Sequence, residues 1–298
     1  MKKKLLITLG CSWTEGYGCY DENTIPIEAR ESKSIDGFDI HPIQDANKNR
    51  FHELGWPNAL GKRLGYDKVI NMGYGGSSTS GQLKRFYESY YNNPFNDYDV
   101  TIIWMLTHPT RFSFYNDYKV EDVMPGMPNL GNMSHLPDDY IGQHYLKFIG
   151  DWQIDPTLEQ LFHIRSMEQY CQNYNFNLLM THTDIKTDAL LKYYHDSKYW
   201  MDPIPDNILF FLDYDTDYSF VCGHPNEVGY LKLVDKLYEL IKNNHSHLLN
   251  RTAVDEIEWE WTGGIRMSWI NPNEDMMDGL IGADYIHQRL RKKKKTLL

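Results

Sequence analysis

The chain has 298 residues, a formal net charge of −11 and 41% hydrophobic residues, which is enough for one large core in a single decorated domain. The negative charge argues against a general nucleic-acid binder, because affinity for phosphate depends on clustered Lys and Arg. The four cysteines form no CxxC pair, and no apolar run approaches the ~20 residues of a membrane span, so we expect a cytoplasmic protein.

The first predicted element is a short apolar run from Leu5 to Leu9 that ends at Gly10. A strand buried on both faces carries such an unbroken run instead of an alternating pattern. The run follows Lys2 to Lys4, as in a secretion signal, but it is shorter than the usual ~7–15 apolar residues of such a signal. We therefore interpret it as the first strand of the fold.

Strand-like and helix-like stretches then alternate along the chain. The other expected strands are Lys68–Met72, Val100–Leu106, Phe176–Thr181 and Ile208–Leu212, and the expected helices are Trp56–Leu64, Gly81–Tyr91, Leu158–Asn173 and Asn226–Asn243. This alternation implies crossover connections and a parallel sheet covered on both faces. The sequence therefore predicts a doubly wound α/β fold with a five-stranded parallel sheet.

Two long spans and the end of the chain depart from this alternation. Residues 21–50 and 112–155 are expected to be irregular loop insertions, and each follows a predicted strand end, where open α/β sheets bind their ligands. The second insertion is rich in Pro, Gly and aromatic residues, and we interpret it as a lid. We assign residues 1–245 to the main domain and residues 246–298, with a predicted helix at Glu274–Arg291, to a C-terminal extension.

A serine lies directly after the first predicted strand, in the block Gly10-Cys11-Ser12-Trp13-Thr14-Glu15-Gly16. A serine at this place presents its hydroxyl at the C-terminal edge of the sheet. The N-terminus of the following helix points backbone N–H groups toward the same spot, as an oxyanion requires. The alternative is that Ser12 only caps that helix, a common role of serine.

Two more blocks follow later strands. The glycine-rich block Asn71-Met72-Gly73-Tyr74-Gly75-Gly76 lacks the known phosphate-loop and dinucleotide patterns. The block Gly223-His224-Pro225-Asn226-Glu227-Val228-Gly229 opens the last predicted helix. A neutral imidazole there can take a proton from a serine and pass it to a leaving group, whereas its simpler role is to cap the helix.

In chain order, the three blocks resemble the GDS-x-T-x-G, N-x-G-x-x-G and H-P-x-x-x-G motifs of SGNH/GDSL-type serine hydrolases, with Cys11 in place of the first motif's Asp. The resemblance implies a flavodoxin-like three-layer sandwich. It also implies that Ser12 is the nucleophile, that His224 is the general base and that Gly76 lends its N–H to the oxyanion hole. It implies no metal ion and no organic cofactor.

The chain departs from the family after the third predicted strand. The family carries G-x-N-D there, with an Asn that donates to the oxyanion, whereas this chain has Thr107-His108-Pro109-Thr110-Arg111. We expect Thr107 or His108 to take the place of that Asn, unless two backbone donors suffice. Arg111 either binds an anionic group of the substrate or forms an ordinary surface ion pair.

A second departure concerns the acid of the catalytic triad. The family places it three residues before the histidine, where this chain has Val221. Because the partner of the imidazole fixes its tautomer, another group must take this role. We expect Asp217 to do so, with Asp213, Asp215 or a backbone carbonyl near Val221 as the alternatives.

The resemblance implies an esterase or deacylase that hydrolyses a small ester through an acyl-enzyme. An O-acetylated carbohydrate is the first substrate to test, because the aromatic residues between Phe112 and Trp152 can stack on sugar faces. We expect a small-molecule or glycan ester as the partner, with no nucleic acid and no membrane. Two alternatives remain: a catalytically silent glycan-binding or structural module, which Val221 would fit, and a flavodoxin-like nucleotide binder, which lacks its phosphate loop.

Overall fold

The computed structural model describes residues 2–92, 94–107, 111–116, 119–123, 156–182 and 212–242. The strands in this part of the chain are β1 (Lys3–Leu9), β2 (Lys68–Asn71), β3 (Tyr98–Leu106), β4 (Phe112–Asn116), β5 (Lys119–Val123) and β6 (Asn177–His182). The helices are α1 (Ser12–Glu15), the 3₁₀ helix η1 (Glu22–Thr24), α2 (Ile27–Ser32), α3 (Ile40–Leu54), α4 (Trp56–Leu64), α5 (Thr79–Asn92), α7 (Pro156–Tyr174), α9 (Tyr214–Asp217) and α10 (Glu227–Lys242).

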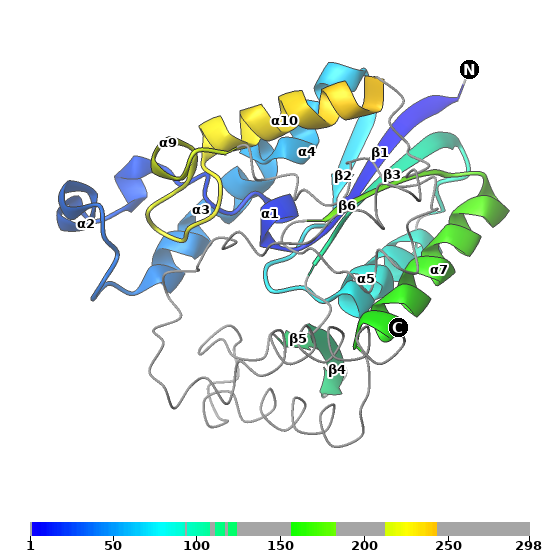
Figure 1. Ribbon diagram of the computed structural model, residues 1–298, viewed down its shortest axis with the longest axis horizontal. Coiled ribbons are helices and arrows are strands. Elements are labelled where there is room, and N and C mark those ends of the chain that lie inside the picture. Colours follow the sequence, from blue (N-terminus) through cyan, green and yellow to red (C-terminus); the bar gives the residue numbers. More distant parts are fainter. Residues whose placement is uncertain are drawn as a thin grey trace, which may run out of the picture.

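A parallel sheet with the strand order β2-β1-β3-β6 forms the centre of the molecule (Figure 1). Its register pairs Thr8 with Asn71 and Leu9 with Trp104. The segments that follow β1, β2 and β3 therefore leave the sheet at one edge, its C-terminal edge. This is the edge at which open α/β sheets bind ligands.

The described sheet has four strands, so the expectation of five is wrong for this part of the chain. The fifth predicted strand comprises residues 208–212. Of these, residues 208–211 lie outside the described residues, and Leu212 lies in a bend. The parallel arrangement, in contrast, is as predicted.

Helices cover both faces of the sheet, α4 and α10 on one face and α5 and α7 on the other (Figure 1). Successive side chains of β1 point to opposite faces. Leu5, Ile7 and Leu9 belong to the core cluster beneath α5 and α7, whereas Leu6 belongs to the cluster beneath α4 and α10. All four side chains have no exposed surface, which explains why the sequence of this strand is apolar without alternation.

Residues 21–50 are not the irregular insertion that the sequence predicted. They contain η1, α2 and most of α3, whose fifteen residues bury Ile43, Asn47 and Phe51. These positions are four residues apart and therefore share one face of the helix. The Asn47 amide lies in the core because it donates to the Ile43 carbonyl and the Thr24 hydroxyl and its oxygen accepts from the Asp21 N–H.

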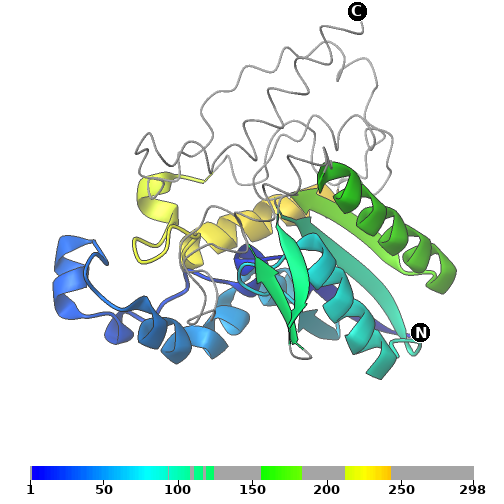
Figure 2. The same cartoon turned by 90° about the horizontal axis from the view of Figure 1, so that it is seen from below.

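The second expected insertion, residues 112–155, begins with an antiparallel hairpin of β4 and β5. The hairpin lies beside α5 in both Figure 1 and Figure 2. Residues 117–118 and 124–155 lie outside the described residues, and no side chain of the span is described, so the expected sugar-binding lid stays a prediction. The C-terminal extension at residues 246–298 also lies outside them, so the division into a main domain and an extension stays a prediction.

Candidate active site

Ser12 is the first residue of α1 and lies where the chain turns sharply after β1. The turn forms because the N–H groups of Thr14 and Glu15 both donate to the Cys11 carbonyl, at 2.9 and 3.0 Å. The helix ends after one turn at Gly16, whose φ of 104° lies in the left-handed region. Ser12 is thereby held at the C-terminal edge of the sheet, with 7% of its surface exposed.

His224 meets Ser12 across this edge, although the two residues are 212 positions apart. The distance from Ser12 Oγ to His224 Nε2 is 2.7 Å, and the imidazole ring lies against the rings of Trp13 and Tyr17, with centroids 5.3 and 5.6 Å away. The other ring nitrogen, Nδ1, is 3.0 Å from the Cys222 carbonyl oxygen. A carbonyl can only accept, so Nδ1 carries the proton, and Nε2 accepts from the Ser12 hydroxyl.

The loop that carries His224 is fixed to its surroundings by several hydrogen bonds. The His224 carbonyl accepts from the Ser219 N–H at 2.8 Å. Asn226 stands just before α10, where its side-chain oxygen accepts from the Gly229 N–H at 3.0 Å and its amide donates to the Thr216 carbonyl at 2.9 Å. The position of the imidazole therefore depends on α9 and α10 together.

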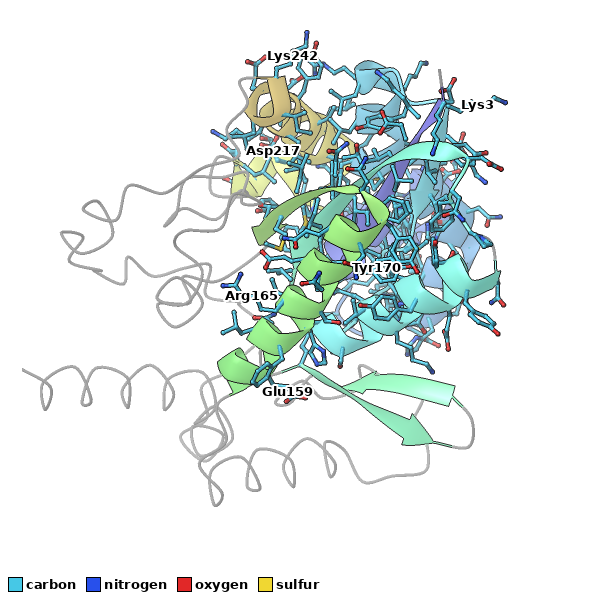
Figure 3. All side chains as sticks on the ribbon, turned by 90° about the vertical axis from the view of Figure 1, so that its right-hand side faces the viewer. Lys3, Glu159, Arg165, Tyr170, Asp217 and Lys242 are labelled. Carbon is cyan, nitrogen blue, oxygen red and sulfur yellow. The ribbon has the colours of Figure 1, made fainter. Side chains whose placement is uncertain are left out.

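Asp217 does not orient His224, which corrects the expectation from the sequence. Its carboxylate is buried, and both carboxylate oxygens accept from Lys232 Nζ at 2.7 Å. One of them also accepts from the Asp213 N–H at 2.8 Å. Figure 3 shows Asp217 on α9 beside α10. Burial raises the pKa of this carboxyl, but the hydrogen bonds from Lys232, Asp213 and Thr216 outweigh it and leave the pKa below its usual value.

The alternatives for this role are also resolved. Asp213 caps α9 by accepting from the N–H groups of Asp215 and Thr216, and Asp215 is exposed. The acceptor at His224 Nδ1 is the carbonyl of Cys222, next to Val221. Ser12 and His224 therefore form a hydrogen-bonded pair whose imidazole is oriented by the main chain.

For this reason, Asp217→Asn should reduce stability and leave catalysis nearly intact. The substitution removes the negative charge opposite Lys232 and one of its two acceptors. Because the Lys232 side chain is half exposed, we expect a loss of about 2 kcal/mol in the free energy of unfolding, below the range for fully buried pairs. The kcat for an activated ester should fall by no more than a few-fold. Urea unfolding and steady-state kinetics measure the two effects, with the exposed Asp215→Asn as the control. A loss near 10⁴-fold in kcat at unchanged stability would restore Asp217 as the triad acid.

The surroundings of His224 keep its ring neutral. Burial, and to a smaller extent the charge of Arg111, lower the pKa of His224 to about 4, against the opposing effect of the hydrogen bond to Cys222. A base must be unprotonated to act. The acid limb of kcat/KM should therefore have its inflection near pH 4, with activity rising as the pH increases through that value. A pH profile with an uncharged ester measures this, and an inflection near the ordinary histidine pKa of about 6.5 would contradict it.

The glycine-rich loop after β2 docks directly on α1. Asn71 ties the two together, because its amide donates to the Thr14 carbonyl at 2.9 Å and its oxygen accepts from the Gly73 N–H at 2.9 Å. A Cβ on Gly73 would lie 2.3 Å from the Glu15 nitrogen, so only glycine allows this close approach. The Glu15 carboxylate accepts from the Gly75 N–H at 2.6 Å.

Gly76 follows in a left-handed conformation, with a φ of 73°. Its Cβ position faces open space. In the described part of the chain, no hydrogen bond uses the backbone N–H of Gly76 or that of Ser12. Both N–H groups are thus available to a ligand, as an oxyanion hole requires.

Thr107 lies at the end of β3, and its hydroxyl is buried. Its carbonyl accepts from the Gln160 side chain at 2.8 Å, but within the described residues its Oγ1 has no hydrogen-bond partner. A buried hydroxyl without a partner costs free energy, which makes it a candidate donor to a bound ligand. His108, the other residue expected in this role, lies outside the described residues.

Replacement of Thr107 by Val should therefore separate activity from stability. If the hydroxyl donates to the oxyanion, kcat should fall by about 10- to 100-fold, somewhat less than the loss of a principal donor. The melting temperature should stay equal or rise, because an unsatisfied buried hydroxyl has been removed. Thr107→Ser keeps the hydroxyl and serves as the control. An unchanged kcat in Thr107→Val would exclude this donor.

Two features of the site were missed by the sequence analysis. The contact of Glu15 with Gly75 links the serine block to the glycine-rich block, and the only signal for it is a carboxylate inside the first block. The aromatic walls of His224 come from Trp13 and Tyr17, which flank Ser12 in the sequence. Within the described ranges, no group of three or more His, Cys, Asp or Glu side chains is arranged to hold a metal ion, and no helix is long and apolar enough to cross a membrane.

The chain matches no known protein-family profile, and no curated protein sequence matches it. Among solved structures, it is similar to a G-D-S-L family lipolytic protein from Desulfitobacterium hafniense DCB-2, with 12% identity and a TM-score of 0.41 over 80% of this chain and 99% of the other. It is also similar to the psychrotrophic esterase EstA from Pseudoalteromonas sp., with 13% identity and a TM-score of 0.41 over 81% of this chain and 98% of the other.

Proposed function

We propose that the chain is a serine hydrolase of the SGNH/GDSL type that cleaves a small carboxylic ester through an acyl-enzyme. The observation that carries the proposal is the 2.7 Å contact between Ser12 Oγ and His224 Nε2. The contact of Nδ1 with the Cys222 carbonyl leaves Nε2 as the acceptor. A serine becomes nucleophilic when a neighbouring base takes its proton as it attacks.

The reaction follows from these positions. Ser12 Oγ attacks the ester carbonyl carbon and gives its proton to His224 Nε2, and the backbone N–H groups of Ser12 and Gly76 stabilise the oxyanion. The imidazolium then protonates the leaving alcohol. A water molecule then attacks the acyl carbon and gives a proton to His224 Nε2. As the bond between Ser12 Oγ and the acyl carbon breaks, the imidazolium returns this proton to Oγ, which releases the acid and restores the Ser12 hydroxyl.

The choice of an O-acetylated carbohydrate as substrate has weaker support. It depends on the aromatic residues between Phe112 and Trp152, and no side chain between residues 112 and 152 is described. The sugar therefore stays a prediction within the broader class of small esters. The alternative is a catalytically silent module. It is supported by Val221, which stands at the position of the triad acid, and by Asp217, which pairs with Lys232 and not with His224.

Pre-steady-state hydrolysis of p-nitrophenyl acetate tests the proposed function. An acyl-enzyme mechanism with slow deacylation releases a burst of p-nitrophenol that is stoichiometric with the protein. We expect such a burst, followed by steady turnover. The alternative, a silent module, would hold if the folded protein shows neither a burst nor turnover. Mass spectrometry would then also detect no acetyl group on the protein.

A further inference from the structure

Two arginines converge on the residue that follows Gly76. Arg111 Nη1 donates to the Ser77 carbonyl at 3.5 Å, and Arg85 Nη2 donates to the Ser77 hydroxyl. The Arg85 guanidinium also lies over the Tyr74 ring, 4.8 Å from its centroid. The loop that carries the oxyanion-hole glycine is thus bordered by two positive charges.

Arg111 is poorly satisfied in this position. A guanidinium has five N–H donors, yet its hydrogen bond to Ser77 is at the long limit, and its Nε is buried without a partner. In the part of the chain that the structure describes, Arg111 forms no ion pair. A partly buried charge without a counterion costs free energy. An anionic ligand bound beside Arg111 would supply the missing counterion.

Arg111 is also close enough to the catalytic pair to influence it. Its charge lowers the pKa of His224, in addition to the effect of burial. Burial raises the pKa of Glu15, whose carboxylate accepts from the Gly75 N–H, and the charge of Arg85 partly opposes this effect. The positive charge of Arg111 therefore acts on His224. The net charge of the whole protein, −11, has the opposite sign.

We propose that Arg111, with Arg85 beside it, forms a subsite for a carboxylate on the substrate, carried on the acyl or the alcohol side of the ester. The planar fork of arginine matches the oxygens of such a group and binds them with two parallel hydrogen bonds. The site thus selects acidic esters over neutral ones. The assignment of an ester depends on the proposed function, whereas the binding of the anion does not.

The test is equilibrium binding to the full chain in a Ser12→Ala background, so that no turnover is needed. The ligands are two matched pairs: monomethyl succinate against dimethyl succinate, with the charge on the acyl side, and acetoxyacetate against methyl acetoxyacetate, with the charge on the alcohol side. At low salt, the anionic member of at least one pair should bind about tenfold more tightly than its neutral partner. The pair that shows this preference identifies the side of the ester that carries the charge.

In Arg111→Gln, this preference should disappear, and in Arg111→Lys it should be reduced, because Lys keeps the charge and loses the fork. Arg63→Gln is the matched control: Arg63 pairs with Asp235 between α4 and α10, so the preference should persist there. Equal binding of both members of both pairs, or a preference that survives in Arg111→Gln, would overturn the proposal. If the preference is found but the wild-type chain cleaves neither these esters nor p-nitrophenyl acetate, the proposed function fails and the anion subsite stands.

Discussion

Ser12→Ala should lower the kcat for p-nitrophenyl acetate by about 10⁴-fold or more. The hydroxyl of Ser12 is the atom that forms the acyl bond, and its contact in the structure is with His224. The loss of one oxygen from a side chain that is 7% exposed changes little in the packing, so we expect stability to change by less than about 1 kcal/mol. Steady-state kinetics and thermal unfolding measure the two effects.

The control for this substitution is Ser166→Ala. Ser166 lies on α7, where its hydroxyl is 3.0 Å from that of Tyr87, so the same chemical change is made away from the dyad. The control should keep wild-type kcat. Wild-type turnover in Ser12→Ala would show that the nucleophile is another residue.

His224→Ala should cause a loss of similar size, about 10³- to 10⁴-fold in kcat. Without the imidazole, no group takes the Ser12 proton, and the hydroxyl is a weak nucleophile at neutral pH. Residues that act as a unit are not additive, so the double variant Ser12→Ala/His224→Ala should be no slower than the worse single variant.

The control for this substitution is His163→Ala, because His163 lies on α7 and pairs with Glu159 on the same helix. It should leave kcat unchanged. A double variant of Ser12 and His224 whose loss equals the product of the two single losses would mean that the two residues act independently.

The sheet and its covering helices could be predicted well because the sequence marks them clearly. The helix α4 has the predicted bounds, Trp56–Leu64. It lies between two glycines and has Pro57 in its first turn, which are the ordinary signals of helix ends. The strand β1 could be recognised because a strand buried on both faces is continuously apolar.

The helix α3 could not be predicted in the same way. Its buried positions include a polar residue, Asn47, between Ile43 and Phe51, so the apolar stripe that normally identifies a helix is interrupted. The amide is tolerated in the core because Ile43, Thr24 and Asp21 satisfy it. That condition depends on tertiary contacts that the sequence does not reveal.

The candidate site could be predicted only where a side chain has a recognisable partner in the sequence. Ser12 and His224 belong to blocks with a known order, and the structure brings them into contact. The acceptor for His224 Nδ1 is a backbone carbonyl, which every residue has, so no residue type signals it. Asp217 was the wrong choice because its true partner, Lys232, lies on the next helix, and the packing of α9 against α10 decides which groups meet.

The most direct test of the account is covalent labelling by a fluorophosphonate, which reacts only with an activated serine. The wild-type chain should gain one phosphonyl group on the peptide that contains Ser12, Ser12→Ala should gain none, and His224→Ala should react far more slowly. Peptide mapping by mass spectrometry identifies the modified residue. A folded wild-type chain that stays unlabelled, or that is labelled at another residue, would contradict the assignment of Ser12 and His224 as the catalytic dyad.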